Sequence, residues 1–281
     1  MGPVAEQTVL VTGSTDGLGK ALARDLAVRG AAVLLHGRSE SRLEESLREI
    51  REATGNGRAR GYLADFSSLA EVRRLAGEVE RDRGRLDLLV NNAGIGGGLP
   101  GGRREESADG HELRFAVNYL APFLLTALLL PLLRRSAPGR IVNVASAGQA
   151  PIDFDDVMLE HGYEGMRAYS QSKLAQIMFT FDLAERLGEE EGLELTVNAL
   201  HPASLMNTKM VYESFGYTMS SVEEGVEATV RLAVSPELDG VSGGYFEGLR
   251  EARAHEQAYD QGARRRLWRL SEELTGLAAP G

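Results

Sequence analysis

Short apolar runs alternate with longer amphipathic runs along most of the chain. Most of the apolar runs are rich in Val, Leu and Ala and the third is weaker, which predicts strands buried on both faces. They span residues 8–12, 31–36, 60–64, 86–90, 140–145 and 195–200, with a short seventh run at 244–246. Strands that alternate with helices predict a doubly wound α/β fold, with a parallel sheet of about seven strands and helices on both faces.

The amphipathic runs between the strands predict the covering helices. In the first of them, Leu18 and Leu22 fall on one helical face. Ser221 and Glu224 have the spacing of a capping box at the start of a later helix. The expected helices span residues 17–29, 39–53, 67–83, 107–135, 168–190 and 222–234, and a C-terminal helix spans about 256–275. No long linker interrupts this pattern, so residues 1–281 are expected to form a single domain.

Composition and charge exclude several classes of protein. The 281 residues are 43% apolar and 26% charged, which is ordinary for a globular protein. The net charge of −10 argues against a nucleic-acid binder. The absence of cysteine excludes disulfides and thiolate metal sites, and the acidic residues of 150–167 have no metal-ligand spacing, so no metal is expected. The most apolar stretch, 120–133, is shorter than the roughly 20 residues of a membrane span, so we expect a cytoplasmic protein with no span.

A glycine-rich turn joins the first predicted strand to the first predicted helix. Its sequence is TGSTDGLG, from Thr12 to Gly19. Such a turn lets the backbone approach a pyrophosphate, and the helix N-terminus offers N–H groups to it. The strand before the turn and the helix after it favour a dinucleotide site over an ordinary tight turn. The expected cofactor contacts are Gly13, Ser14, Thr15, Asp16, Gly17, Leu18 and Gly19.

The residues after the second strand bear on the choice of cofactor. Gly37 and Arg38 stand where an NAD-preferring site has Asp or Glu. A guanidinium pairs with the 2′-phosphate that a carboxylate would repel, so we expect NADP(H) in preference to NAD(H). Asp16 counts against a strongly cationic site, and the alternative is that Arg38 is only a solvated loop residue.

At this point the motifs resemble those of the short-chain dehydrogenase/reductase family, of the single-domain type. The resemblance covers about residues 8–250. It is carried by the glycine-rich turn, Asp65, NNAG at Asn91–Gly94, Asn118, Ser146 and YSQSK at Tyr169–Lys173. It implies a Rossmann fold and hydride transfer between a nicotinamide and a carbonyl or an alcohol. Tyr-x-x-x-Lys alone carries little weight, but five motifs in the family's order are specific.

The resemblance implies catalytic roles for Asn118, Ser146, Tyr169 and Lys173. Tyr169 would be the general acid and base, and Ser146 would hydrogen-bond the substrate oxygen. Lys173 follows Tyr169 by one helical turn, so its ammonium is expected to lower the pKa of Tyr169 and to hold the nicotinamide ribose. Asn118 would hold a water in a proton relay with the lysine. Further implied cofactor contacts are Asp65, Phe66, Asn92, Ala93, Gly94, Pro202 and Thr208.

Two segments are expected to bound the substrate. Ser146 and Tyr169 are 23 residues apart, where many relatives have about a dozen. The added segment, about 147–168, resembles that of retinol-dehydrogenase-like members and is expected to form one wall of the cleft. Residues 203–222 are rich in Met and aromatics and are expected to form a lid over an apolar ligand; the alternative is packing without contact to substrate. Ala203 stands where the family more often has Gly, which leaves the local loop geometry open.

These residues predict an NADP(H)-dependent ketoreductase or alcohol dehydrogenase acting on a bulky apolar molecule. The likeness extends to retinol-dehydrogenase-like reductases and to bacterial ketoreductases that tailor polyketides, and it does not choose between their substrates. Two alternatives remain: an NADP(H)-binding module without redox turnover, and a cyclase or isomerase. The apolar stretch 120–133 is either a homodimer interface or the inner face of one subunit covered by the C-terminal tail.

Overall fold

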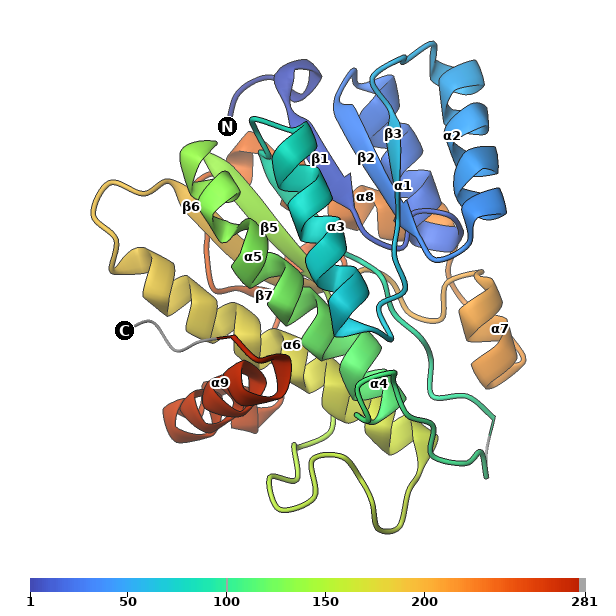
Figure 1. Ribbon diagram of the computed structural model, residues 1–281, viewed down its shortest axis with the longest axis vertical. Coiled ribbons are helices and arrows are strands. Elements are labelled where there is room, and N and C mark those ends of the chain that lie inside the picture. Colours follow the sequence, from blue (N-terminus) through green and yellow to red (C-terminus); the bar gives the residue numbers. More distant parts are fainter. Residues whose placement is uncertain (100, 278–281) are drawn as a thin grey trace.

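A single mixed sheet organises the protein, as a computed structural model of residues 1–99 and 101–277 describes it. The remaining residues of the predicted domain, 100 and 278–281, lie outside the described part. The strands are β1 Thr8–Val11, β2 Ala32–Gly37, β3 Arg60–Leu63, β4 Leu88–Asn91, β5 Gly139–Val144, β6 Leu195–His201, β7 Tyr245–Glu247 and β8 Arg250–Glu251. Their order is β3-β2-β1-β4-β5-β6-β7-β8, and only the β7–β8 pair is antiparallel (Figure 1). The predicted doubly wound fold is confirmed, with an eighth strand that the pattern did not predict.

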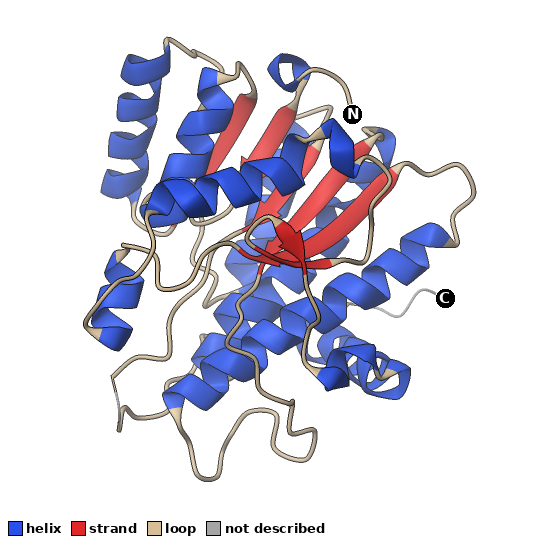
Figure 2. Ribbon diagram, turned by 180° about the vertical axis from the view of Figure 1, so that it is seen from behind, coloured by secondary structure: helices blue, strands red, loops and turns tan. Residues whose placement is uncertain are grey.

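Helices cover both faces of the sheet. One face carries α1 Gly17–Val28, α2 Glu40–Thr54 and α8 Val222–Val234. The other carries α3 Leu69–Asp82, α5 Ala121–Arg135 and α6 Gly165–Gly188 (Figures 1 and 2). The capping box at the start of α8 is confirmed, with both reciprocal bonds between Ser221 and Glu224 present.

Each face has its own apolar core, because successive side chains of a strand point to opposite sides. In β1, Leu10 packs into the core beneath α3 and α5, whereas Val9 and Val11 pack beneath α1 and α8. Both layers are therefore fastened to one rigid sheet, and the loops at its carboxyl edge start from fixed points.

The expected long helix over 107–135 is wrong in its first part. The helix begins as α4 Leu113–Phe115, widens into a π-helical turn at Ala116–Leu120, and continues as α5. Residues 107–112 form a loop instead, because their backbone bonds elsewhere: Ser107 N–H donates to the His111 carbonyl and Ala108 N–H to that of Ser67.

The stretch Leu113–Arg135 is long and apolar enough to cross a membrane by length and composition alone. Within the protein, however, 78% of its most apolar 18-residue window is buried. It packs between α3 and α6 at the centre of one core. This agrees with the alternative in which segment 120–133 is the inner face of one subunit. Dimerisation through the long helices stays a prediction.

The expected C-terminal helix consists of a 3₁₀ turn at Glu256–Tyr259 followed by α9 Gln261–Thr275. α9 packs on α6 (Figure 1) through the indole of Trp268. That ring lies 5.2 Å from Phe123 and 5.8 Å from Phe179, between ring centroids, and the Arg186 guanidinium lies 3.9 Å above it. The C-terminal helix therefore covers part of the surface of α6.

Removing the buried anchor of α9 should destabilise the whole domain. Leu267 is buried in the core, so we expect Leu267→Ala to lower the free energy of unfolding by about 2–4 kcal/mol. Urea unfolding followed by circular dichroism measures this. The neighbouring Arg265→Ala is the control, because that side chain is exposed, and should change stability by less than about 0.5 kcal/mol. Equal stability of Leu267→Ala and wild type would mean that α9 is not part of the cooperative unit.

Candidate active site

A cavity of about 660 Å³ opens at the carboxyl ends of the parallel strands. This is the edge where ligands bind in open α/β sheets. The predicted residues that line it are Gly13, Thr15, Asp16, Gly17, Leu18, Gly19, Arg38, Asp65, Phe66, Asn92, Ala93, Gly94, Ser146, Tyr169, Lys173, Pro202 and Thr208. Two predicted residues, Ser14 and Asn118, are fully buried and do not line it.

The glycine-rich turn is packed too closely for side chains at two positions. A Cβ on Gly19 would lie 2.2 Å from the Gly13 carbonyl oxygen and 2.4 Å from Asn92 Nδ2. Gly13 has a φ of +64°, and a Cβ there would lie 2.7 Å from Ala93 Cα. The start of α1 is thus drawn against the end of β1, and its residues Gly17, Leu18 and Gly19 line the cavity. This backbone cradle fits the pyrophosphate of a dinucleotide.

The ends of β1 and β4 are fastened to one another beneath this cradle. Thr12 Oγ1 accepts hydrogen bonds from the N–H groups of Asn92 and Ala93, at 2.9 and 3.0 Å. Asn92 Nδ2 donates to the carbonyls of Thr12 and Gly13, at 2.8 and 3.1 Å. Asn92 therefore fixes the glycine-rich turn and lines the cavity as well.

Charged side chains gather where the turn meets β2. Arg38 is exposed at the cavity, and no described residue forms an ion pair with it. Arg42, on the first turn of α2, lies 3.7 Å from the Asp16 carboxylate, between Nη1 and Oδ2. Asp16 also caps α1 by accepting from Gly17 N–H at 2.8 Å. Its charge is thus offset by the helix N-terminus and by Arg42.

The other end of the cavity brings Ser146, Tyr169 and Lys173 together. Ser146 follows β5, and its Oγ accepts from Gly148 N–H at 3.0 Å. Tyr169 and Lys173 come from the first turns of α6. Lys173 Nζ lies 5.8 Å from the centre of the Tyr169 ring and donates to the Val144 carbonyl at 2.9 Å and to Gln176 Oε1 at 3.0 Å.

The prediction that Lys173 lowers the pKa of Tyr169 is wrong for this structure. Burial raises the pKa of Tyr169, and a hydrogen bond from Ser146 opposes that rise only in part. Burial also lowers the pKa of Lys173 to about 7. Loss of water disfavours both the phenolate and the ammonium, and it is the main cause of both shifts.

Asn118 lies in the π-helical turn with its side chain fully engaged. Its Oδ1 accepts from Ile95 N–H at 2.8 Å, and its Nδ2 donates to the Ile95 carbonyl at 3.1 Å and to Ser172 Oγ at 2.9 Å. A Cβ placed on Gly94 would lie 3.2 Å from Asn118 Oδ1 and 3.6 Å from Lys173 Nζ. Asn118 therefore lies near Lys173, and its side chain binds the backbone of the loop after β4.

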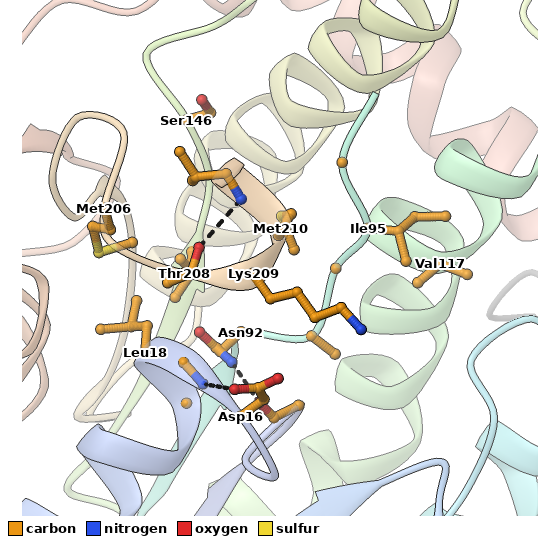
Figure 3. A pocket seen from close by; sticks show the side chains of 18 of the residues that line it. Asp16, Leu18, Asn92, Ile95, Val117, Ser146, Met206, Thr208, Lys209 and Met210 are labelled. Atoms are coloured by element: carbon orange, nitrogen blue, oxygen red, sulfur yellow. Dashed lines mark hydrogen bonds between the residues drawn. The ribbon is translucent and has the colours of Figure 1, made fainter. Parts of the chain in front are cut away.

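The predicted lid borders the cavity. It contains α7 Lys209–Phe215, and Figure 3 shows Met206, Thr208, Lys209 and Met210 around the opening. Lys209 extends toward the side that carries Ile95 and Val117 (Figure 3). The loop does not need glycine at Ala203, because the non-glycine residue of the lid with a positive φ is Leu205, at +46°.

Only the two ends of the predicted segment 147–168 line the cavity, and its role as a wall of the cleft stays a prediction. Ala147, Gly148 and Met166 line the cavity, whereas the residues between them do not. The middle of the segment is held instead by the C-terminal region. Gln257 Oε1 accepts from Ile152 N–H at 2.6 Å, and its Nε2 donates to the Ile152 carbonyl at 3.1 Å. The described residues contain no group of three or more His, Asp or Glu side chains that could hold a metal ion.

Sequence reasoning missed cavity residues near the nucleotide end, among them Arg42 and His36. Arg42 lies on the first turn of α2, and the available signal was a second arginine four residues after Arg38. His36 ends the second strand, and its ring contacts the glycine-rich turn, which no local pattern reveals. Ile95 was also missed at the apolar end, and only the folded loop after β4 brings it there.

A profile of the family described as short chain dehydrogenase matches residues 7–216. The chain belongs to the short-chain dehydrogenase family, whose members are oxidoreductases that bind nicotinamide cofactors. It is 40% identical to retinol dehydrogenase 13 of Mus musculus over 97% of this chain and 84% of that protein. It is 33% identical to polyprenol dehydrogenase of Homo sapiens over 98% of this chain and 87% of that protein.

Solved structures share the fold. An uncharacterised protein from Mycobacterium paratuberculosis matches with a TM-score of 0.80 and 31% identity, over 98% of this chain and 96% of that one. A short chain dehydrogenase from Shigella flexneri in complex with NADP matches with a TM-score of 0.72 and 25% identity, over 87% of this chain and 98% of that one. The first covers nearly the whole chain, including the C-terminal region beyond the family profile.

The buried lysine should make stability depend on pH. The pKa of Lys173 is about 7 in the folded protein and 10.5 for an ordinary lysine. Between these values the unfolded chain binds more protons, so the free energy of unfolding rises with pH, by up to about 1.4 kcal/mol per pH unit. Lys173→Met removes this contribution. From about pH 7.5 to about pH 9, wild type should gain about 2 kcal/mol over the variant in urea unfolding. Parallel pH profiles for the two proteins would contradict the lowered pKa.

Proposed function

We propose that this protein is an NADP(H)-dependent oxidoreductase that interconverts a carbonyl and an alcohol on a bulky apolar molecule. The observation that carries this proposal is one cavity lined at one end by the glycine-rich turn and at the other by Ser146, Tyr169 and Lys173. Bound nicotinamide would supply the hydride for reduction or accept it in oxidation. The chain's own residues would bind both partners and move the proton.

Three groups of residues would hold the cofactor. The turn from Gly13 to Gly19 would bind the pyrophosphate through backbone N–H groups, with Ser14 acting from the buried side of the turn. Arg38 would pair with a 2′-phosphate, because no described residue neutralises it. The remaining proposed contacts are Asp65, Phe66, Asn92, Ala93, Gly94, Tyr169, Lys173, Pro202 and Thr208.

Tyr169 is the proposed proton donor in carbonyl reduction. Its raised pKa keeps the phenol protonated at neutral pH, which is the form that a donor needs. An emerging alkoxide is far more basic than a phenolate and would take this proton. Ser146, which follows β5 at the same end of the cavity, would donate a hydrogen bond to the substrate oxygen as negative charge develops on it. In alcohol oxidation the same groups act in reverse.

Lys173 would act at the same end, with a pKa of about 7 that allows it to gain or lose a proton near neutrality. A proton on Nζ would stabilise phenolate after Tyr169 has donated. Asn118 is proposed to support this site through the Ile95 backbone, to which it makes two hydrogen bonds.

The apolar end of the cavity supports a bulky apolar substrate. Ile95, Met166, Leu205, Met210 and Val211 line it. Flexible thioethers adapt to long or irregular apolar ligands. The names of the retinol and polyprenol dehydrogenases assign long apolar alcohols to those relatives. The cytoplasmic location and the homodimer stay predictions.

The test of the reaction is cofactor consumption by Tyr169→Phe. We expect wild type to oxidise NADPH in the presence of bulky ketones or retinoid aldehydes. The variant should lose about 10²–10⁴-fold in kcat, because phenylalanine has no hydroxyl proton to donate. The dissociation constant for NADPH should stay within about threefold, because the ring remains. Stopped-flow absorbance at 340 nm and fluorescence titration measure the two quantities.

Tyr212→Phe is the matched control. That tyrosine is exposed on α7 and does not line the cavity, so the same loss of a hydroxyl should leave kcat unchanged. Tight NADPH binding without consumption over the substrate panel would favour the binding module. Conversion of substrate without net NADPH consumption would favour the cyclase or isomerase.

The choice of cofactor is tested at Arg38. A charge-assisted hydrogen bond is worth about 1.5–3 kcal/mol, so Arg38→Ala should weaken NADPH binding by about 10–100-fold and leave NADH binding unchanged. Arg48→Ala, exposed on the helix α2 that follows Arg38, is the control and should alter neither. An equal loss for both nucleotides, or a wild-type preference for NADH, would contradict the role of Arg38.

A further inference from the structure

His36 joins the end of β2 to the glycine-rich turn through its ring. The side chain is buried, with 3% of its surface exposed, yet it borders the nucleotide end of the cavity. Its Nδ1 lies 3.1 Å from the Gly13 amide nitrogen, and its Nε2 lies 3.1 Å from the Ala64 carbonyl oxygen after β3. One ring therefore bridges three segments that meet at the carboxyl edge of the sheet.

The two partners fix the tautomer of the ring. The Gly13 N–H can only donate, so Nδ1 must present its lone pair. The Ala64 carbonyl can only accept, so Nε2 must carry the hydrogen. The ring is thus neutral, and it stacks on Phe66 with 4.3 Å between centroids. Burial lowers the pKa of His36 to about 4, although the nearby Asp65 carboxylate and the Ala64 carbonyl favour the protonated form.

The backbone of His36 binds the next residue of the turn. Its carbonyl accepts from Ser14 N–H at 2.9 Å, and its N–H donates to Ser14 Oγ at 2.9 Å. This explains why Ser14 is buried instead of lining the cavity. A Cβ on the following residue, Gly37, would lie 2.4 Å from Thr15 Cγ2, so the turn lies directly against the strand end.

A fixed Gly13 matters because the rest of the turn is built on it. The Gly13 carbonyl would lie 2.2 Å from a Cβ on Gly19, so the first and third glycines are in contact. A shift at Gly13 would therefore move the first turn of α1 and its backbone N–H groups. A turn held in place before binding avoids the cost of ordering it on binding.

We propose that His36 is a positioning residue for the nucleotide, and that its neutral ring accepts the Gly13 N–H and so presets the glycine-rich turn for the pyrophosphate. This inference rests on the proposed function, since it requires that the turn binds a dinucleotide. In this role His36 acts through the Gly13 N–H and not on the reacting atoms. It acts on affinity for the cofactor and leaves the chemical step unchanged.

Two amide side chains separate the roles of the two ring nitrogens. In His36→Asn, Oδ1 can replace Nδ1 as the acceptor for Gly13 while the Ala64 contact is lost. In His36→Gln, the longer amide can donate to the Ala64 carbonyl in place of Nε2, while the acceptor for Gly13 is lost. His36→Phe keeps an aromatic ring against Phe66 and removes both hydrogen bonds.

The experiment is fluorescence titration of each intact variant with NADPH, together with kcat at saturating NADPH. We expect His36→Asn to bind within about threefold of wild type, and His36→Gln and His36→Phe to bind about tenfold more weakly. The value of kcat at saturation should be unchanged in all three. Thermal melting reports whether each variant is folded. If His36→Phe does not fold, the comparison of His36→Asn with His36→Gln alone tests whether the acceptor for Gly13 sets the affinity for NADPH.

Two results would overturn the proposal. If NADPH affinity were normal in His36→Gln and weak in His36→Asn, the effect would belong to the contact with Ala64. If all variants bound NADPH as tightly as wild type, the glycine-rich turn would not need the His36 ring to hold it. Both would leave the proposed function intact. If wild type bound neither NADPH nor NADH, the proposed function would fail first, and the role of His36 with it.

Discussion

The close contact between the start of α1 and the end of β1 is the constraint on which the nucleotide end depends. At Gly13 and Gly19 two backbone segments touch with no room for a Cβ, and the Asn92 amide fills the remaining contact from β4. Three segments distant in sequence therefore meet through main-chain atoms and one side chain. Since the strands are locked in register within the sheet, this junction places the helix N-terminus and its donors in one position.

Burial sets the chemistry at the opposite end of the cavity. Tyr169 and Lys173 lie on adjacent turns of α6, and desolvation pushes each toward its neutral form. A neutral phenol can give a proton, and an amine with a pKa near 7 can exchange one. Both side chains are therefore held toward their neutral forms, which can respond when a charge develops beside them. That arrangement trades stability for reactivity, as active sites commonly do.

The sequence predicted the parts of this molecule that depend on local pattern. Continuous apolar runs located the first seven strands, and glycine spacing located the turn. It missed β8, because Arg250 and Glu251 carry no apolar signal. It extended one helix back to Ser107, because tertiary hydrogen bonds there overrule a helix-compatible sequence. The charge balance at Tyr169 was predicted with the wrong sign, because the extent of burial follows from the whole fold and not from the spacing of two residues.

The position of α9 has a consequence for how the chain is made. Phe123 and Phe179 pack against Trp268, which is synthesised well after both of them. Until α9 has been synthesised, the sheet and α6 can assemble while this aromatic surface stays open to the solvent. Transiently exposed apolar surface of this kind is what chaperones bind and what drives aggregation. Burial of this surface therefore waits for α9, which is synthesised well after Ser146, Tyr169 and Lys173.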